Sequence, residues 1–241
     1  MKEVCIYHIA EQFLFEYYFQ PGEYRICEED HAGELLSKGL SQEKRGGLMG
    51  ALQSYEKALA FNPVSTQIYF RLISVYFRLG QLEELFSRTK EVYPYLSTKA
   101  EMAQYYRWLG YYYLEKYQPE LSAALYRYST LFSKSAQAEE EIRYLEAAMD
   151  RKLADDSERE LQEKLQKAGI PVTASNVTLA LLYRAGQEAL QHATDAAGKN
   201  ETATAKHWRQ QALDCFSMIY DLTEDAQIKE EMEALSRMDL S

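Results

Sequence analysis

Cys27 and His31 have residue types and a spacing that suggest metal chemistry. On a helix, positions i and i+4 share one face, and Glu28, Glu29 and Asp30 place carboxylates between them. Zinc sites combine such ligands, but they need a second pair at similar spacing. The sequence offers no such pair, so we predict no metal site. The other three histidines are isolated, at His8, His192 and His207.

Sequence motifs that mark catalysis are missing as well. The histidines form no HExxH motif, and no serine stands in a G-x-S-x-G context. No glycine-rich loop could cradle a phosphate, because Gly46-Gly47 is better explained as a tight turn between two helices. We therefore expect no catalytic residue and no cofactor.

Aromatic residues are concentrated between positions 64 and 134. This stretch holds 17 of the 31 aromatic residues, twelve of them tyrosine, and nine Lys/Arg against six Asp/Glu, although the whole chain has a net charge of −10. Two interpretations compete. The tyrosines fill gaps between helices, with hydroxyls that reach water or backbone, or some of them form a binding surface beside arginines.

Helices must position these side chains. Apolar residues recur at helical spacing, and the prolines fall where that periodicity resets. Thr98-x-x-Glu101 and Ser157-x-x-Glu160 are typical of capping boxes that begin helices. Alternating runs typical of strands are absent, so we predict about twelve helices. The five prolines are Pro21, Pro63, Pro94, Pro119 and Pro171.

The segment Val4–Phe19 could be a strand or a buried helix, because it is apolar and aromatic throughout. Its length, and the stop at Gln20-Pro21-Gly22, favour a helix. We predict that it packs as an N-terminal cap against the helix that holds Leu35, Leu36 and Leu40. Burial in a symmetric dimer is the alternative, because an uncapped apolar end of a helix stack tends to associate with a second copy of itself.

A repeated pattern begins around Ala51–Pro63. Small residues at Ala51 and Ala58 flank Tyr55, and Gly39 lies twelve residues before Ala51. Similar patterns follow, with three extra residues near Pro94–Ser97 and an insert at Thr194–Ala205. Their residues are Tyr69, Leu72, Tyr76 and Gly80; Tyr106, Leu109, Gly110, Tyr113, Ser122, Tyr126 and Ser129; and, in degenerate form, Leu182, Ala185, Gly186, Ala189, Ala212, Phe216 and Ile219.

These residues resemble the tetratricopeptide repeat, specifically over about 28–134 and weakly over 172–222. The resemblance implies an all-α fold, a right-handed α-solenoid of antiparallel helix pairs. We expect a single helical-repeat domain over 1–241. Its parts are a capping helix (1–27), three repeats (28–134), linking helices (135–170), and a degenerate repeat with a C-terminal capping helix (172–241).

In this family the concave face of the first helices lines a binding groove. The resemblance therefore implies a groove that is either open or covered by the chain's own segment 137–170. Carried over residue by residue, it consists of Gln67, Phe70, Ser74, Phe77, Gln104, Arg107, Tyr111 and Leu114, flanked by Arg71, Arg78 and Trp108.

Composition narrows the class of partner. The acidic net charge argues against nucleic acid, and no apolar stretch is long enough to span a membrane. Three widely separated cysteines indicate reduced thiols in a cytoplasmic protein. The local excess of arginine and lysine over 64–134 predicts preference for an acidic segment.

The resulting expectation is a non-catalytic adaptor that binds a peptide or protein segment. One alternative is a regulatory sensor that closes around a signalling peptide, as in bacterial regulators of similar architecture, although residues 1–45 are too few and too acidic for a basic recognition helix. The other is an enzyme on a helical-repeat fold, which would require clustered acids in a pocket.

Overall fold

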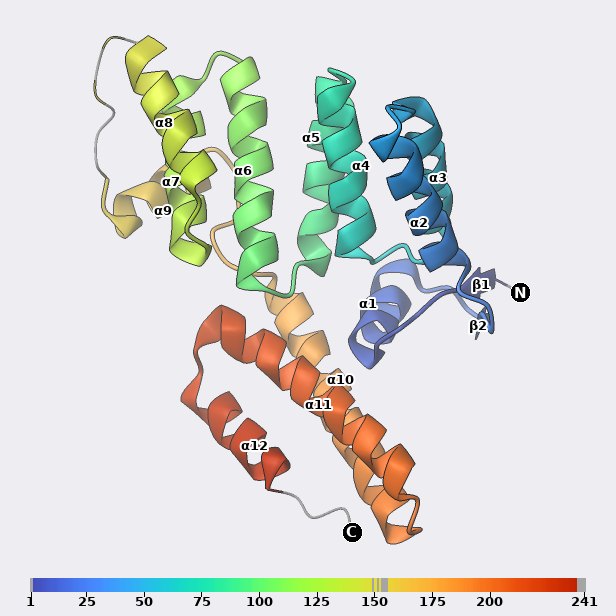
Figure 1. Cartoon of the computed structure of the whole chain (residues 1–241). Coiled ribbons are helices and arrows are strands. Elements are labelled where there is room, and N and C mark those ends of the chain that lie inside the picture. Colours follow the sequence, from blue (N-terminus) through green and yellow to red (C-terminus); the bar gives the residue numbers. More distant parts are fainter. Residues whose placement is uncertain (1, 149, 151, 153–155, 238–241) are drawn as a thin grey trace. The chain divides into compact units, whose positions relative to one another are not determined.

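The protein is an all-α chain built from antiparallel helix pairs (Figure 1). The structure is a computed structural model and describes residues 2–148, 150, 152 and 156–237. Over these residues it contains twelve α-helices, one short 3₁₀-helix and two three-residue strands. The predicted fold class and the approximate number of helices are confirmed.

The chain groups into two compact units. Unit 1 combines residues 1–68 with 175–241, and unit 2 is the continuous stretch 69–174. Whether the two form a single domain stays a prediction. Unit 1 contains β1 (Lys2–Val4), α1 (Ile9–Phe19), β2 (Tyr24–Ile26), α2 (His31–Lys44), α3 (Leu48–Phe61), α10 (Asn176–Gly198), α11 (Thr202–Thr223) and α12 (Ala226–Ser236). Unit 2 begins within α4 (Thr66–Arg78) and continues with α5 (Leu82–Val92), η1 (Tyr93–Tyr95), α6 (Lys99–Glu115), α7 (Pro119–Phe132), α8 (Ala136–Ala148) and α9 (Glu158–Lys167).

Three helix pairs share one packing device, in which a glycine on the first helix faces an aromatic ring on the second. A Cβ atom added to Gly39 would lie 2.3 Å from the Tyr55 ring, and one added to Gly110 would lie 3.1 Å from the Tyr126 ring. At Gly186 the distance to the ring of Phe216 would be 3.0 Å. The glycines therefore allow α2–α3, α6–α7 and α10–α11 to approach closely, as the repeat pattern predicts.

In the α4–α5 pair the residues at the corresponding repeat positions have the sizes reversed. Ile73 takes the place of the glycine on the first helix, and Thr89 takes the place of the ring on the second. Both are fully buried, and the Thr89 hydroxyl donates to the carbonyl of Leu85 at 2.7 Å. Tyr69 joins the two helices through a hydrogen bond of 2.9 Å from its hydroxyl to Glu91. Compared with the other three pairs, the larger side chain is thus on the first helix and the smaller one on the second, and the two helices still pair.

The insert at Thr194–Ala205 lengthens helices rather than forming a loop. α10 continues to Gly198 and α11 begins at Thr202, so only a short turn separates them. Ala193, Ala196 and Ala205 are buried in the added turns. Alanine leaves the two backbones room to run close together along this extension.

The N-terminal segment differs from its prediction. Ile9–Phe19 is helical as predicted, but Val4 belongs to β1, which pairs in parallel with β2, so a helix over the whole of Val4–Phe19 was wrong. α1 is not the expected cap on the helix of Leu35, Leu36 and Leu40, although Cys5, earlier in the segment, contacts the start of that helix at Ala32. α1 packs against α10, and Ile9 and Ala10 share a buried cluster with Leu182 and Phe216.

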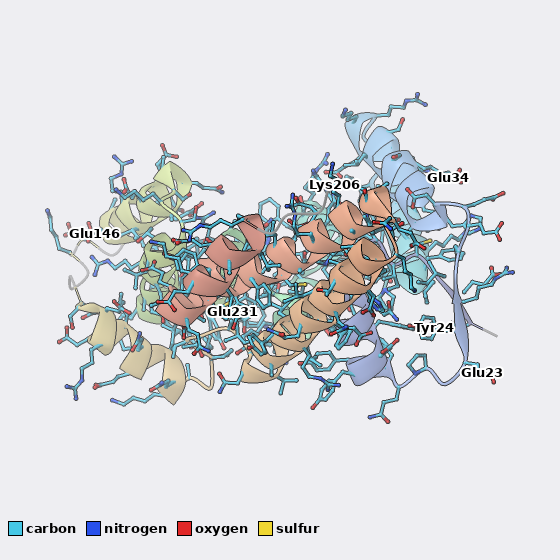
Figure 2. The ribbon with its side chains drawn as sticks, turned by 90° about the horizontal axis from the view of Figure 1, so that it is seen from below. Glu23, Tyr24, Glu34, Glu146, Lys206 and Glu231 are labelled. Carbon is cyan, nitrogen blue, oxygen red and sulfur yellow. The ribbon has the colours of Figure 1, made fainter. Side chains whose placement is uncertain are left out.

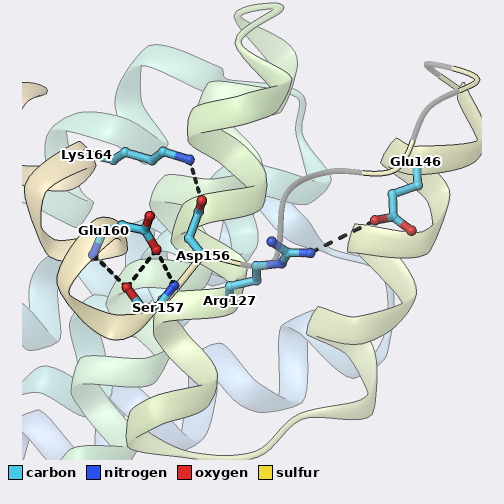
Figure 3. Close-up of polar contacts among 6 residues, drawn as sticks. All are labelled: Arg127, Glu146, Asp156, Ser157, Glu160 and Lys164. Atoms are coloured by element: carbon cyan, nitrogen blue, oxygen red, sulfur yellow. Dashed lines mark hydrogen bonds and ion pairs between the residues drawn. The ribbon is translucent and has the colours of Figure 1, made fainter.

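Local signals fixed the helix boundaries. The capping boxes at Thr98 and Ser157 are both formed, and Figure 3 shows the second beside the ion pair of Lys164 with Asp156. The same view shows Arg127 of α7 reaching Glu146 of α8 at 4.0 Å. Each proline lies outside a helix or in its first turn, and the three extra residues near Pro94 form η1.

Tyrosine hydroxyls hold the segment that follows α9. Three consecutive carbonyls, those of Pro171, Val172 and Thr173, accept hydrogen bonds from three different tyrosines. Tyr106 donates at 2.9 Å, Tyr128 at 2.6 Å and Tyr93 at 2.9 Å. The interpretation that tyrosines fill gaps and reach nearby backbone is confirmed for these residues.

Candidate functional site

Unit 2 contains a pocket of about 580 Å³, which we call the α6 pocket. α6 supplies most of its lining because residues at spacings of three and four lie on one helix face. The opposite face of α6, with Tyr105, Tyr106 and Leu109, is buried in the helix stack. The lining consists of Phe77, Ala100, Gln104, Arg107, Trp108, Tyr111, Leu114, Glu115, Tyr126, Ser133, Gln137, Ala138 and Glu141.

α8 forms the far wall of the α6 pocket. Ala138 and Leu145 are buried in a cluster with Ala123 and Tyr126 of α7, so α8 is held by its own apolar stripe. Gln137, Ala138 and Glu141 contribute to the lining. The described residues of α8 therefore border this pocket.

Aromatic rings form one side of the pocket. Phe77, near the end of α4, is 42% exposed although it is a large apolar residue. Its ring centroid lies 5.7 Å from that of Trp108 and 4.8 Å from that of Tyr111, with the second contact edge-on. Edge-on contacts suit the charge distribution of aromatic rings and hold the three in a fixed arrangement.

Two nitrogen donors in the pocket have no acceptor among the described residues. They are Nε of Arg107 and Nε1 of Trp108, and both atoms are buried. Arg107 is anchored by its other end, where Nη2 donates to the carbonyl of Ser133 at 2.7 Å. A buried N–H without an acceptor costs about 1–3 kcal/mol. Both atoms lack accessible surface, so a ligand oxygen would reach them only after these side chains shift.

The pocket carries more negative than positive charge. Glu115 and Glu141 oppose the single guanidinium of Arg107. Burial lowers the pKa of Arg107, which nevertheless stays charged at neutral pH. Burial raises the pKa of Tyr111, with smaller contributions from the charge of Glu115 and a hydrogen bond to it, so this hydroxyl stays protonated.

The structure brings together six of the eleven residues expected in a groove. Phe77, Gln104, Arg107, Trp108, Tyr111 and Leu114 line the α6 pocket. The other five lie elsewhere on α4: Phe70 is buried, Ser74 is half-buried, and Gln67, Arg71 and Arg78 are exposed. Most of the residues that the sequence missed belong to α8 and the turn before it, which match no repeat position.

The suspected cysteine–histidine pair does not share a helix. His31 is the first residue of α2 and Cys27 follows β2, so the predicted i, i+4 relationship on one helix face was wrong. Over the described residues, no three side chains of the metal-binding types are grouped as a metal site would require.

Unit 1 has smaller hollows of its own. One of about 250 Å³ lies where α10, α11 and α12 meet, lined by Leu190, Phe216 and Leu235 among others. Glu231, labelled in Figure 2, ties α12 to α10 there by accepting hydrogen bonds from Tyr183 and Gln187, both at 3.2 Å. Another, of about 440 Å³, lies between α1 and α10.

None of the helices that the structure describes combines the length and the apolar composition needed to cross a membrane.

Comparison with known proteins adds little to these observations. No protein-family profile matches the chain, and no curated protein matches it. Among solved structures, the chain is similar to the crystal structure at 1.50 Å of a TPR repeats protein from Bacteroides fragilis NCTC 9343. The sequences are 15% identical, the similarity covers 88% of this chain and 100% of the other, and the TM-score is 0.36. We base no argument on a score of this size.

Proposed function

We propose that this protein binds a peptide or protein segment in the α6 pocket and performs no catalytic step. The observation that carries the proposal is a pocket that places the exposed ring of Phe77 and the half-buried rings of Trp108 and Tyr111 beside the guanidinium of Arg107. Exposed aromatic residues beside arginine are typical of surfaces that bind protein segments tightly. The pocket's volume is suited to one or two side chains of a ligand together with a stretch of its backbone.

The two sides of the pocket favour different parts of such a ligand. Phe77, Trp108 and Tyr111 offer apolar area for an aliphatic or aromatic side chain. The buried N–H groups of Arg107 and Trp108, which lack an acceptor, suit backbone carbonyls once these side chains shift to expose them.

We infer the ligand's charge from the charged residues that line the pocket, and not from the net charge of residues 64–134. The excess of basic residues over 64–134 predicts an acidic partner, but Glu115 and Glu141 stand in the pocket itself. Like charges across an interface are unfavourable, so we now propose a segment with an apolar residue close to lysine or arginine.

A displayed library of random short peptides, selected against the full chain, tests this proposal. We expect enriched peptides to carry an apolar residue beside a basic one and to bind more weakly at high salt. Phe77→Ala/Tyr111→Ala removes two pocket rings and should weaken binding by about tenfold or more. Tyr117→Ala/Tyr144→Ala is the matched control, because these rings are 93% and 65% exposed and neither lines the pocket.

Two results would contradict the proposal. One is a set of enriched peptides that bind both double variants equally well, because their site would then lie elsewhere. The other is a library that shows no enrichment on the wild-type chain over the pocket variant.

A further inference from the structure

Cys5 and Cys27 lie side by side although 21 residues separate them in the sequence. The parallel register pairs Val4 with Ile26, and each cysteine is the next residue on its strand. The backbone N–H of Cys27 donates to the carbonyl of Val4 at 2.8 Å, so the pairing continues past the last assigned pair. Partners in a parallel ladder point their side chains to the same face, so the two thiols lie on one face of the ladder next to each other.

The surroundings of the two sulfur atoms differ. Cys5 is 3% exposed, and its Sγ accepts the backbone N–H of Ala32, in the first turn of α2, at 3.4 Å. Its own N–H is bonded to the carbonyl of Phe61 at 2.9 Å, so its backbone is fixed. Cys27 is half-buried and is the thiol that a small solute can reach. The third cysteine, Cys215, is fully buried in α11.

We propose that Cys5 and Cys27 are a redox-active pair that a hydroperoxide converts into a disulfide. The Cys27 thiolate attacks one oxygen of the peroxide, the O–O bond breaks, and Cys27 becomes a sulfenic acid as water (or an alcohol) leaves. The sulfur of Cys5 then attacks the sulfur of Cys27. The S–O bond breaks, a second oxygen leaves as water, and one S–S bond has formed at the expense of two S–H bonds.

The spacing of paired strands suits a disulfide between neighbouring residues. Neighbouring strands lie about 4.8 Å apart, within the range of roughly 4.4–6.8 Å between Cα atoms that a disulfide bridges. The new bond would close a loop that contains α1 and β2, and closing such a loop limits the unfolded chain. Oxidation should therefore raise the melting temperature by roughly 5–10 °C.

The reaction should be faster at alkaline pH. Burial raises the pKa of the Cys27 thiol, and the hydrogen bond and charge of Cys5, together with the charge of Glu3, raise it further, while Arg25 lowers it. The thiolate is the reacting form, so its fraction increases as the pH approaches that pKa.

The experiment treats the reduced full-length chain with hydrogen peroxide, blocks the remaining thiols and maps the peptides without reduction. We expect a linked pair of peptides that contains Cys5 and Cys27, lighter than their sum by two hydrogen atoms. The rise in melting temperature should accompany it and disappear on treatment with a thiol reductant. Cys27→Ser is the control and should show neither the link nor the reversible rise.

The proposal fails if Cys27 can be trapped as a sulfenic acid while Cys5 stays reduced, because the second step would then not occur. It also fails if Cys27 links to another chain, or if both thiols remain reduced under conditions that oxidise a free cysteine peptide. A melting temperature that rises equally in Cys27→Ser would attribute the effect to another oxidised side chain.

Discussion

Replacing the packed glycines by alanine should have effects that differ with the space at each site. In a helix, alanine is favoured over glycine by about 1 kcal/mol, and this gain applies equally to Gly39 and Gly110. The steric terms differ. The new Cβ would lie 2.3 Å from the ring of Tyr55 in the first case and 3.1 Å from that of Tyr126 in the second.

The Tyr55 ring has little freedom to move away. It is fully buried, and its hydroxyl donates to Glu43 at 2.8 Å. Overpacking of this kind costs typically ~1–3 kcal/mol. The contact at Gly39 is close and the ring is held, so a cost near the upper end, less the helix gain, should lower the free energy of unfolding of Gly39→Ala by about 2 kcal/mol. At Gly110 a shift of a few tenths of an ångström relieves the contact, so Gly110→Ala should change stability by less than about 1 kcal/mol.

Urea denaturation followed by far-ultraviolet circular dichroism measures both variants. A double-mutant cycle then tests the cause, because in a Tyr55→Leu background Gly39→Ala should no longer be destabilising. Equal effects of Gly39→Ala and Gly110→Ala, or a penalty at Gly39 that persists after Tyr55→Leu, would refute the reasoning.

Two further predictions concern buried polar groups. Burial raises the pKa of Glu11 in the folded protein, so the folded state favours the protonated acid. The protonated acid stabilises the fold at low pH, and this stabilisation is lost as the pH rises through the folded-state pKa. Glu11→Gln keeps one oxygen that can accept from the N–H of Tyr7 and the amide of Asn62. It should therefore raise the melting temperature at pH 7 and change it little in acid. An unchanged melting temperature at pH 7 would contradict this. Tyr106→Phe should destabilise the protein by about 1 kcal/mol, because the carbonyl of the half-buried Pro171 loses its donor. Tyr117→Phe, at a ring 93% exposed, should have no effect on the same denaturation curve.

The sequence predicted those features that depend on neighbouring residues. Helix ends follow from prolines, capping boxes and glycines at turns, such as Gly80 with its positive φ of 68°, and these signals act within a few residues. The pairing of helices also followed, because Gly39 and Tyr55 lie at the spacing that a close helix pair requires.

Contacts between distant segments were not predictable in this way. β1 and β2 are three residues each, too short to show an alternating pattern, and only the pairing of one with the other makes them strands. α1 offers an apolar face to any partner, and nothing in its own sequence specifies α10.

The candidate site also combines residues that local sequence predicts with residues that depend on distant contacts. α6 contributed residues that a repeat pattern predicts, because their spacing is set by the helix itself. The wall from α8 depends on how Ala138 and Leu145 pack against α7. The apolar spacing of α8 could have indicated that packing, but it gives no register relative to α6.

The division of the chain into units has a consequence for its biosynthesis. Unit 2 is one continuous stretch, so it can fold as soon as residue 174 has left the ribosome. Unit 1 needs both ends of the chain, because Ile9 and Ala10 pack with Leu182 and Phe216. At roughly 5–20 residues per second, the N-terminal helix waits on the order of ten seconds for its partners. During that time its apolar face is open to chaperones, and a nascent chain that stops after unit 2 would expose that face indefinitely.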